Sequence, residues 1–271
     1  MPELPEVETI VRRLRGDADR PALIGRAFTG AAVLWPPTVS APSPRRFAAS
    51  IVGRRVEEIG RRGKFIVLSL NGATLLFHLR MGGGLAVERA GAPLPRDARL
   101  VLSLDDGQRL VFRNARKFGR AWLVADPAEV LGRLGPEPLD DRFRAADLGR
   151  GLRDRRRQLK PLLLDQAFLA GVGNIYADEA LHRAGLHPST DARRVSVAQA
   201  ERLWRALRRV LRDAIRHNGT TFDSAYEGGG FGRRLRVYGR AGGPCRRCGA
   251  AIRRIVVGGR GTHFCPRCQP R

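Results

Sequence analysis

Residues 65–79 read FIVLSLNGATLLFHL. Two apolar runs flank the pair Asn71-Gly72, and an Asn-Gly pair in that position is a strong signal for a two-residue β-hairpin turn. The same pattern recurs over residues 100–112, around Asp106-Gly107. Together with the other short β-rich runs between about residues 22 and 125, these hairpins predict an antiparallel β-sandwich.

An amphipathic helix is predicted ahead of this β-rich region. Val7, Ile10, Val11 and Leu14 recur at helical spacing after Pro5, a residue that suits the first turn of a helix. We expect this helix to pack its apolar face on the sandwich, because an isolated amphipathic helix would leave that face in water.

Residues 131–140 contain two closely spaced prolines and no apolar period, and they predict a linker. Helical spacing then returns, and the clearest helix starts at a capping box formed by Ser196 and Gln199. A glycine-rich stretch at residues 223–236 predicts a flexible loop. The predicted fold class is α+β and multidomain, with an N-terminal β-sandwich unit at residues 2–130, a helical unit at 141–222 and a C-terminal module at 237–271.

The chain is strongly basic. Its 271 residues hold 50 Lys and Arg against 26 Asp and Glu, a formal charge of +24. Such an excess is typical of proteins that bind a polyanion, and it predicts nucleic acid as the partner. One face of the helix that starts at Ser196 is rich in arginine, which fits either a solvated face or phosphate contacts. Its arginines are Arg202, Arg205, Arg208, Arg209 and Arg212.

Targeting signals and membrane spans are not recognisable in the sequence. No apolar run approaches 18 residues, and the N-terminus lacks a basic segment followed by an apolar one. We therefore expect a cytoplasmic protein without a membrane partner. Nothing in the sequence indicates oligomerisation, and we expect a monomer.

Four cysteines fall in the last 27 residues. Cys245-x2-Cys248 and Cys265-x2-Cys268 have the spacing of two knuckles that together present four thiolates to one Zn²⁺ ion. A site closed by four thiolates has no open coordination position, so the zinc is predicted to be structural. Arg260 lies between the two pairs at a glycine-flanked turn, where it could reach a DNA backbone or be an ordinary solvated arginine.

The N-terminus offers a nucleophile. Removal of Met1 would leave Pro2 with a free secondary amine, and an α-amino group has a pKa of roughly 7.7 to 8.0, so part of it is unprotonated near neutral pH. Attack by a secondary amine on a sugar carbon gives an iminium, which is an electron sink. Glu3 and Glu6 place two carboxylates within one helical turn. The alternative is that Pro2 and these acids only open a helix.

Two further features are candidates for function. The chain has only three lysines, Lys64, Lys117 and Lys160, so each can mark a place where guanidinium would not serve. The stretch Gly171-Val172-Gly173-Asn174 precedes a predicted helix, whose exposed amides could bind a phosphate with Asn174 as an extra donor. It could equally be a structural turn.

Taken together, the motifs resemble the formamidopyrimidine-DNA glycosylase family of bacterial base-excision repair enzymes. The resemblance spans residues 2 to 268 in the family's order. The motifs that carry it are PELPEVET at residues 2–9, RGKF at 62–65, HLRMG at 78–82, RKFG at 116–119, GVGNIYADE at 171–179 and VYGR at 237–240.

The resemblance implies a bifunctional DNA glycosylase and AP lyase that excises oxidised purines such as 8-oxoguanine and formamidopyrimidines from double-stranded DNA. Pro2 would attack C1′ and form a Schiff base, and Glu3 would shuttle protons. Glu6 would hold the terminus. Lys64 and Arg260 would contact the phosphates of the damaged nucleotide and assist the β- and δ-elimination steps, respectively.

The resemblance also implies DNA contacts. A base that leaves the stack leaves a hole in the duplex, and Met81, Arg116 and Phe118 would fill it. Without the resemblance, Met81 and Phe118 would be interpreted as core residues. The helical unit would be the family's helix-two-turn-helix domain, and its implied phosphate contacts are Arg155, Lys160 and Asn174.

Departures from the family pattern affect details of recognition. Asn114-Ala115 replaces a usual Asp-Pro, and Asp97 replaces a common histidine. The loop over residues 222–234, which corresponds to the family's lesion-covering loop, is short, so an endonuclease VIII-type preference for oxidised pyrimidines stays open. A non-catalytic zinc-bearing DNA-binding protein is the alternative of another class, and it leaves Pro2, Glu3 and Lys64 unexplained.

Overall fold

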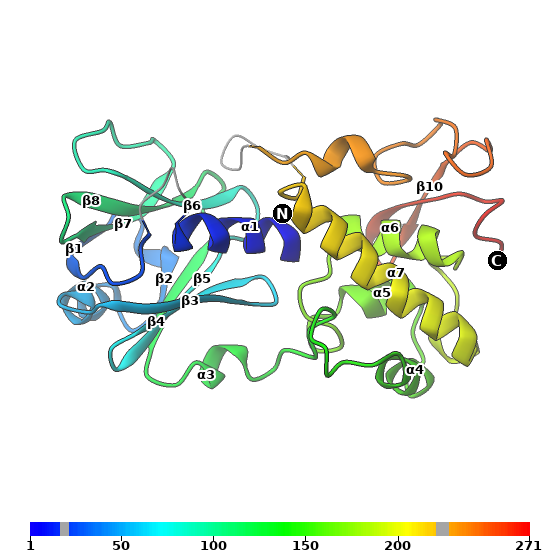
Figure 1. The fold of residues 1–271 in the computed structure, drawn as a ribbon, viewed down its shortest axis with the longest axis horizontal. Coiled ribbons are helices and arrows are strands. Elements are labelled where there is room, and N and C mark those ends of the chain that lie inside the picture. Colours follow the sequence, from blue (N-terminus) through cyan, green and yellow to red (C-terminus); the bar gives the residue numbers. More distant parts are fainter. Residues whose placement is uncertain (17–21, 221–227) are drawn as a thin grey trace. The chain divides into compact units, whose positions relative to one another are not determined.

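The structure is a computed structural model that describes residues 1–16, 22–220 and 228–271. The chain divides into two compact units (Figure 1). The first comprises Met1–Gly132 with Thr220–Gly229, and the second comprises Arg133–Gly219 with Gly230–Arg271.

Two β-sheets form the first unit, as the sequence predicts. One sheet has the order β1-β7-β8-β6, and the other has the order β2-β9-β5-β4-β3. The strands are β1 (Phe28–Val33), β2 (Val39–Ala41), β3 (Val56–Arg62), β4 (Phe65–Leu70), β5 (Ala73–His78), β6 (Gly83–Arg89), β7 (Ala98–Leu104), β8 (Gln108–Asn114) and β9 (Arg120–Val124).

Both predicted hairpins are confirmed. Strands β4 and β5 pair antiparallel, with Gly72 at φ +77°, and β7 and β8 pair antiparallel, with Gly107 at φ +76°. One pairing departs from the predicted antiparallel order, since β2 runs parallel to β9. The chain crosses from one sheet to the other between β1 and β2, so the short β2 enters the second sheet beside a strand of the same direction.

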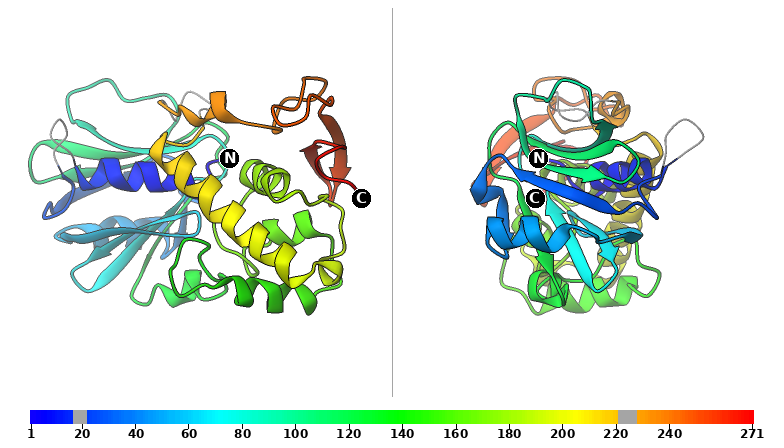
Figure 2. Two further views of the ribbon diagram at one scale, coloured as in Figure 1. Left: turned by 45° about the vertical axis from the view of Figure 1, so that its right-hand side comes forward. Right: turned by 90° about the vertical axis from the view of Figure 1, so that its left-hand side faces the viewer.

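Two helices lie along the open sides of the sandwich (Figures 1 and 2). Helix α1 (Leu4–Arg15) contacts the edge strands β3 and β6, and helix α2 (Pro44–Ile51) contacts the opposite edge strands β1 and β2. The first helix was predicted, and the second was not. Its local signals are Pro44 at the helix start and the i, i+4 pair Phe47 and Ile51, both fully buried.

The core of this unit is shared by both sheets and both helices. Phe77 of β5 and Phe112 of β8 come from different sheets, and their rings lie 5.2 Å apart, centroid to centroid. Val11 of α1 and Phe47 of α2 belong to the same buried cluster. The helices are therefore part of the sandwich core and fix its two sides.

The second unit combines helices with a C-terminal hairpin. Helix α7 starts directly after Ser196, and the reciprocal bonds between Ser196 and Gln199 confirm the predicted capping box. The elements are α4 (Ala145–Arg153), α5 (Leu159–Leu164), α6 (Asn174–Ala184), η2 (Ala192–Arg194), α7 (Val197–Arg216), η3 (Phe231–Arg234), β10 (Arg253–Val257) and β11 (Arg260–Phe264); the short α3 (Ala128–Leu131) precedes this unit.

One arginine of α7 does not belong to the charged face on which the sequence placed it. Arg208 is buried and donates to the carbonyl oxygens of Pro138 and Asp140 and to the Asp141 carboxylate. It fastens the predicted linker to α7 and is not available to a phosphate.

The predicted flexible loop at residues 223–236 falls partly outside the described residues, which resume at Gly228. From Gly230 onward, two apolar side chains anchor the segment. Phe231 is buried with its ring 5.9 Å from that of Tyr176, and Leu235 is also buried. The flexibility of this loop stays a prediction.

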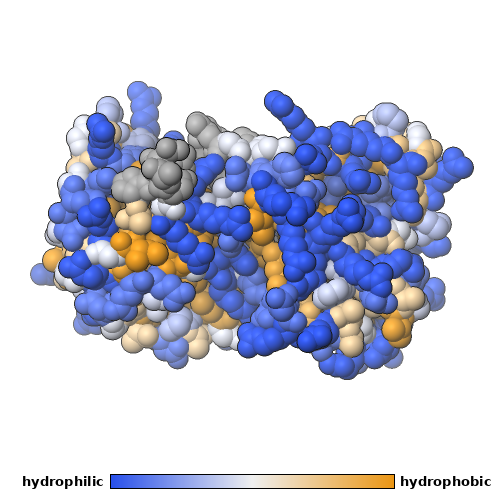
Figure 3. All heavy atoms as spheres, viewed as in Figure 1, coloured by the Kyte–Doolittle hydropathy of each residue, from blue (hydrophilic) through white to orange (hydrophobic). Residues whose placement is uncertain are grey.

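The surface agrees with the composition. The face seen in Figure 3 is dominated by hydrophilic residues. None of the helices in the described part of the chain combines the length and apolar character that a membrane span requires.

Candidate active site and zinc module

Helix α1 runs antiparallel to β3. Near the helix C-terminus, Arg15 Nε donates to the Ile59 carbonyl oxygen at 2.7 Å, and further toward the N-terminus Glu8 pairs with Arg61 at 3.2 Å. Following this register, the N-terminal end of α1 lies beside the turn between β3 and β4, which carries Lys64. The predicted nucleophile and the predicted lysine therefore share one end of the sandwich.

Strand pairing brings further predicted residues to that end. His78, the last residue of β5, pairs with Phe65 on one side and with Arg120, the first residue of β9, on the other. The loop after β5 carries Met81, and the loop before β9 carries Phe118. Both loops thus leave the same end of the sheet as the Lys64 turn.

Buried carboxylates hold the N-terminal segment. Pro2, Glu3 and Glu6 are buried, the two glutamates at 2% exposure each. One Glu6 oxygen accepts from the Glu3 backbone N–H at 2.8 Å, and the other accepts from the backbone N–H and the hydroxyl of Thr220 at 2.8 and 2.9 Å. Glu6 thus joins the backbone of Glu3 to Thr220, and its role in holding the terminus stays a prediction. Met1 is 46% exposed, so its removal would leave the core packing unchanged.

Lys64 lies in a largely buried position at the same end, with 5% exposure. His78 is nearby, and burial, followed by the charges of Arg80 and Lys64, lowers the pKa of His78 to about 3. Its Nδ1 accepts from the Arg80 backbone N–H at 3.1 Å. The imidazole is therefore neutral near pH 7 and adds no further positive charge beside Lys64.

The three residues predicted to fill a vacated base position are presented at the surface. Met81 is 39% exposed, Phe118 is 50% exposed, and Arg116 Nη1 lies 3.4 Å from the Met81 sulfur. Neither apolar side chain belongs to the core, although their residue types alone favour burial. Large apolar side chains held in water are a feature of binding surfaces.

In the second unit, Arg260 lies at the start of β11 after a tight turn. Gly258 and Gly259 both have positive φ, and a Cβ on Gly258 would lie 2.6 Å from Cγ of Pro161. The next carbonyl, that of Gly261, accepts from Asn174 Nδ2 at 3.1 Å. The exposed Arg260 is thus presented by a hairpin that packs on the start of α6, next to Asn174.

Lys160, a predicted phosphate contact, lies inside the second unit. Its side chain is fully buried, and Nζ lies 2.7 Å from Asp178 Oδ1, 2.8 Å from Thr262 Oγ1 and 3.0 Å from the Gly261 carbonyl oxygen. Thr262 and Gly261 accept hydrogen bonds from the ammonium group, and Asp178 supplies its counter-charge. Lys160 thus supports the hairpin that presents Arg260, and its predicted contact with a phosphate stays a prediction.

Two carboxylates of α6 were missed by the sequence analysis. Asp178 also accepts from the His263 backbone N–H at 2.8 Å, and Glu179 accepts from three successive backbone N–H groups, those of residues 236–238. Burial raises the pKa of Glu179, while the three amide donors act to lower it. Adjacent acids inside the motif GVGNIYADE were the available signal, because buried carboxylates require partners.

The four predicted zinc ligands lie together. Their sulfur atoms are all within 4.8 Å of one another, with Cys248 and Cys265 at 3.4 Å and Cys245 and Cys268 at 3.9 Å. A tetrahedron with Zn–S bonds of about 2.3 Å has edges of about 3.8 Å, so the four thiolates fit a zinc ion. Backbone N–H groups of Arg247 and Cys268 point at the Cys245 and Cys265 sulfurs, respectively, at 3.4 Å.

His182, at the end of α6, contacts this cluster. Its Nε2 lies 3.4 Å from the Cys245 sulfur, and burial, together with neighbouring arginines, lowers the pKa of His182 to about 4. The imidazole is therefore neutral near pH 7. Since a thiolate only accepts hydrogen bonds, Nε2 carries the proton when the cysteine is a zinc ligand.

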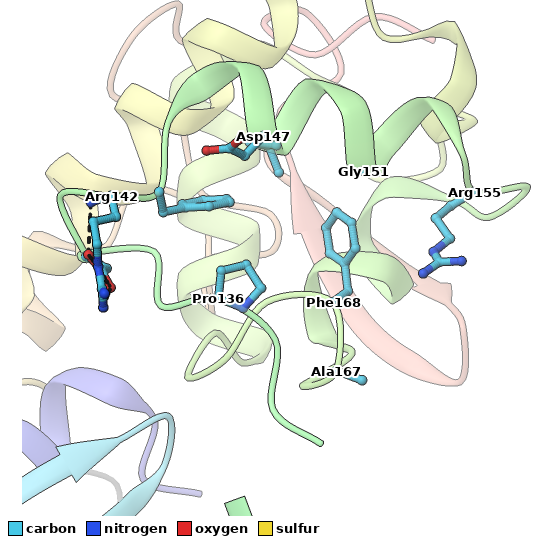
Figure 4. A pocket seen from close by; sticks show the side chains of 10 residues that line it. Pro136, Arg142, Asp147, Gly151, Arg155, Ala167 and Phe168 are labelled. Atoms are coloured by element: carbon cyan, nitrogen blue, oxygen red, sulfur yellow. Dashed lines mark hydrogen bonds and ion pairs between the residues drawn. The ribbon is translucent and has the colours of Figure 1, made fainter. Parts of the chain in front are cut away.

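Arg155, a predicted phosphate contact, lines a cavity of about 610 Å³ in the second unit. In Figure 4, Phe168 and Pro136 extend into this cavity and the Arg155 guanidinium lies at its side. No contact of the described residues assigns a ligand to it, and the role of Arg155 stays a prediction.

Known proteins match the chain along its whole length. Residues 1–121 match the formamidopyrimidine-DNA glycosylase N-terminal domain, residues 134–225 the H2TH domain of the same enzymes, and residues 242–271 a zinc finger found in FPG and IleRS.

Relatives and solved structures agree. Formamidopyrimidine-DNA glycosylase of Herpetosiphon aurantiacus is 45% identical, with 99% of this chain and all of the relative covered, and that of Chloroflexus aggregans is 46% identical, with 99% and 98% covered. Lactococcus lactis Fpg (MutM) in complex with DNA containing N7-benzyl-Fapy-dG aligns over both full chains, with a TM-score of 0.92 and 33% identity. A MutM complex with carbocyclic 8-oxo-G DNA gives 0.91 and 33%, also over both full chains.

The fold and the site define a class: DNA glycosylases with an N-terminal β-sandwich, an H2TH domain and a C-terminal zinc finger. Within that class, the chain belongs to the formamidopyrimidine-DNA glycosylase family.

Proposed function

We propose that the protein excises oxidised purines, including 8-oxoguanine and formamidopyrimidines, from double-stranded DNA and then cuts the strand at the abasic site. Family membership supports the reaction class, and the solved relatives that align with the chain hold DNA with such lesions or an abasic site. Because the relatives are bacterial, we infer that it works on chromosomal DNA in the cytoplasm, in association with the nucleoid.

The first chemical step uses the N-terminal amine. Once Met1 is removed, the Pro2 nitrogen lone pair forms a bond to C1′, and the electrons of the glycosidic bond leave with the base, which takes up a proton. The C1′–O4′ bond then breaks, O4′ receives a proton from Glu3, and the nitrogen, having lost its own proton, forms the iminium. Glu6 orients this segment through its bonds to Glu3 and Thr220.

The second step cuts the strand. The iminium withdraws electrons from C2′, so a base can remove a C2′ proton while the 3′ phosphate leaves with the C3′–O electrons. A second elimination then releases the 5′ phosphate. Lys64 and Arg260 are the cations proposed to contact these phosphates and to stabilise their charge as they leave.

The second unit offers a site for the DNA backbone. In the second unit, the exposed Arg260 and the N-terminus of α6 with Asn174 form a site for the phosphate backbone. Cys245, Cys248, Cys265 and Cys268 would hold one zinc ion. When bound, that ion supplies folding free energy to the hairpin and takes no part in the chemistry.

One observation carries this proposal: Pro2 is buried next to Glu3, whose backbone N–H donates to the Glu6 carboxylate, at the end of the sandwich that also carries Lys64. The test is borohydride reduction in the presence of a duplex with 8-oxoguanine, which should trap a covalent enzyme–DNA complex through the iminium. Pro2→Gly should weaken the trap, and a tag ahead of Pro2 should abolish it. A tag after Arg271 is the control and should leave it intact.

The result also separates the alternatives. No trapped complex at full zinc occupancy would contradict an amine-based mechanism and favour a DNA-binding protein without catalysis. Single-turnover cleavage of matched duplexes with 8-oxoguanine, a formamidopyrimidine or an oxidised thymine would rank the lesions. Faster cleavage of the oxidised thymine would favour an endonuclease VIII-type preference.

A further inference from the structure

Two surface loops of the first unit meet at a single buried side chain. One loop contains Met81 and follows β5, and the other contains Arg116 and Phe118 and precedes β9. They are more than 30 residues apart in sequence. Asn114, the last residue of β8, is fully buried between them.

The Asn114 amide makes four hydrogen bonds. Its Nδ2 donates to the carbonyl oxygens of Leu79 at 2.9 Å and Met81 at 3.2 Å. Its Oδ1 accepts from the backbone N–H groups of Phe118 at 2.8 Å and Gly119 at 3.1 Å. A primary amide has two donor hydrogens and one oxygen with two lone pairs, so the side chain is used completely. One pair of bonds goes to each loop.

The backbone of both loops depends on this arrangement. Arg80 in one loop and Lys117 in the other have φ of +52° and +60°, in the left-handed region that non-glycine residues avoid. Such conformations persist where surrounding contacts fix them. Lys117 has two such contacts: its backbone N–H donates to the Asn114 carbonyl oxygen at 3.1 Å, and its Nζ lies 4.3 Å from the ring centroid of Trp35.

The residues around the Asn114 amide are closely packed. A Cβ on Gly83 would overlap the Leu79 carbonyl oxygen and would lie 2.8 Å from Asn114 Nδ2. A Cβ on Gly119 would lie 3.2 Å from Asn114 Cγ, and nearer still to the Phe112 ring. Both loops therefore approach the amide as closely as backbone atoms can.

We propose that Asn114 is a positioning residue that holds the Met81 loop and the Phe118 loop as one rigid wedge for the gap left by an extruded base. This inference rests on the proposed function, which assigns Met81, Arg116 and Phe118 to that gap. Asn114 does not touch DNA itself. It acts by fixing two loops that would otherwise move independently, and it thereby favours the extruded state of the lesion.

The variants Asn114→Ala and Asn114→Asp separate the contributions of the two pairs of hydrogen bonds. Alanine removes all four hydrogen bonds. Aspartate keeps the acceptor for the Phe118 and Gly119 amides but turns an oxygen toward the Leu79 and Met81 carbonyls, so it releases only the Met81 loop. Asn71→Ala and Asn71→Asp are matched controls, since the exposed Asn71 accepts one backbone hydrogen bond in a turn of the same unit.

Two substrates isolate the effect. A duplex with 8-oxoguanine requires the gap to be filled, whereas a single-stranded oligonucleotide with a preformed abasic site has no gap. We expect Asn114→Ala to lower the ratio of duplex excision to single-strand cleavage by about 10- to 100-fold, and Asn114→Asp by less. The Asn71 variants should keep the wild-type ratio. An unchanged ratio in the Asn114 variants would overturn the proposal.

A double-mutant cycle tests the mechanism of action. If Asn114 works through the wedge, adding Asn114→Ala to a Met81→Ala/Phe118→Ala enzyme should have little further effect on the ratio. Multiplying losses would overturn the proposal. Failure of the proposed function is distinguishable, because the wild-type enzyme would then cleave neither substrate. If the alanine variant does not fold, as judged by its thermal melting, the aspartate variant provides the same comparison.

Discussion

The two units hold their exposed functional side chains by different means. In the first unit, a neutral amide, Asn114, fixes the loops that carry Met81 and Phe118. In the second unit, a buried ion pair between Lys160 and Asp178 supports the hairpin that carries Arg260. Loss of a neutral amide has a local cost, whereas loss of one partner of a buried ion pair leaves an uncompensated charge. The amide suits the proposed insertion of Met81 and Phe118 into the base stack. The ion pair suits the proposed contact of Arg260 with phosphate.

The units also differ in chemistry. The proposed reacting groups, Pro2 and Glu3, belong to the first unit, and the second contains the zinc site and the proposed phosphate contacts. Changes in the first should therefore alter the rate of excision, and changes in the second should alter stability and DNA affinity.

The largest expected effect tests this division. Glu3→Gln should slow excision of 8-oxoguanine by about 10²- to 10⁴-fold, because the variant cannot transfer a proton. DNA affinity, measured by fluorescence anisotropy, should stay near the wild-type value. Glu8→Gln is the matched control on the same helix, where Glu8 pairs with Arg12 and Arg61. Equal losses in both variants would mean that Glu3 acts only structurally.

The buried ion pair of the second unit should give the next effect. Asp178→Asn leaves the Lys160 ammonium without its counter-charge and should lower the free energy of unfolding by about 3–5 kcal/mol. Asp165→Asn, which breaks the more exposed pair with Arg157, should cost less than about 1 kcal/mol. Denaturant titration of both variants measures the difference. A small loss at Asp178 would remove the contrast between the two units.

Acid should destabilise the first unit through His78. Its folded-state pKa of about 3 lies below the value of 6.5 expected in the unfolded chain, so the unfolded state binds the proton first. The contribution is complete above pH 6.5 and is lost as pH falls toward 3, by about 3 kcal/mol at pH 4. His78→Gln should flatten that part of the stability profile. An identical slope in the wild-type and His78→Gln proteins would refute the assignment.

The smallest expected effect concerns the metal. His182→Phe removes the hydrogen bond to the Cys245 thiolate and should accelerate zinc loss to a chelator by about tenfold. In the cobalt-substituted protein, the sulfur-to-metal charge-transfer band should also shift. His187→Phe is the control, because this buried histidine packs on Phe264 and not on a sulfur. A band at the same position in all three proteins would exclude a role for His182.

Local signals account for what the sequence could predict. The Asn71-Gly72 turn, the capping box at Ser196 and the two CxxC pairs each depend on a few adjacent residues, and the structure has all three as predicted. Family resemblance added the proposed roles of Pro2 and Lys64, which residue types alone do not single out.

Contacts between residues distant in the chain account for what the sequence could not predict. The buried positions of Lys160 and Arg208 could not be predicted, because the backbone carbonyls that they contact come from residues about 70 to 100 positions away. By the family resemblance, Asn114 is only a departure that affects details of recognition. Its four hydrogen bonds show that it instead joins the loops that carry those contacts.

Helix α1 has a consequence for solubility. The proposed nucleophile directly precedes its N-cap, and along its length the helix contacts the edge strands β3 and β6. An uncovered edge strand is a template for pairing with another chain and hence for aggregation. A chain that lost this helix would lose its reactive terminus and would also expose two unpaired strand edges. Such an inactive truncated form should therefore precipitate, and it would not persist as a competitor for damaged sites.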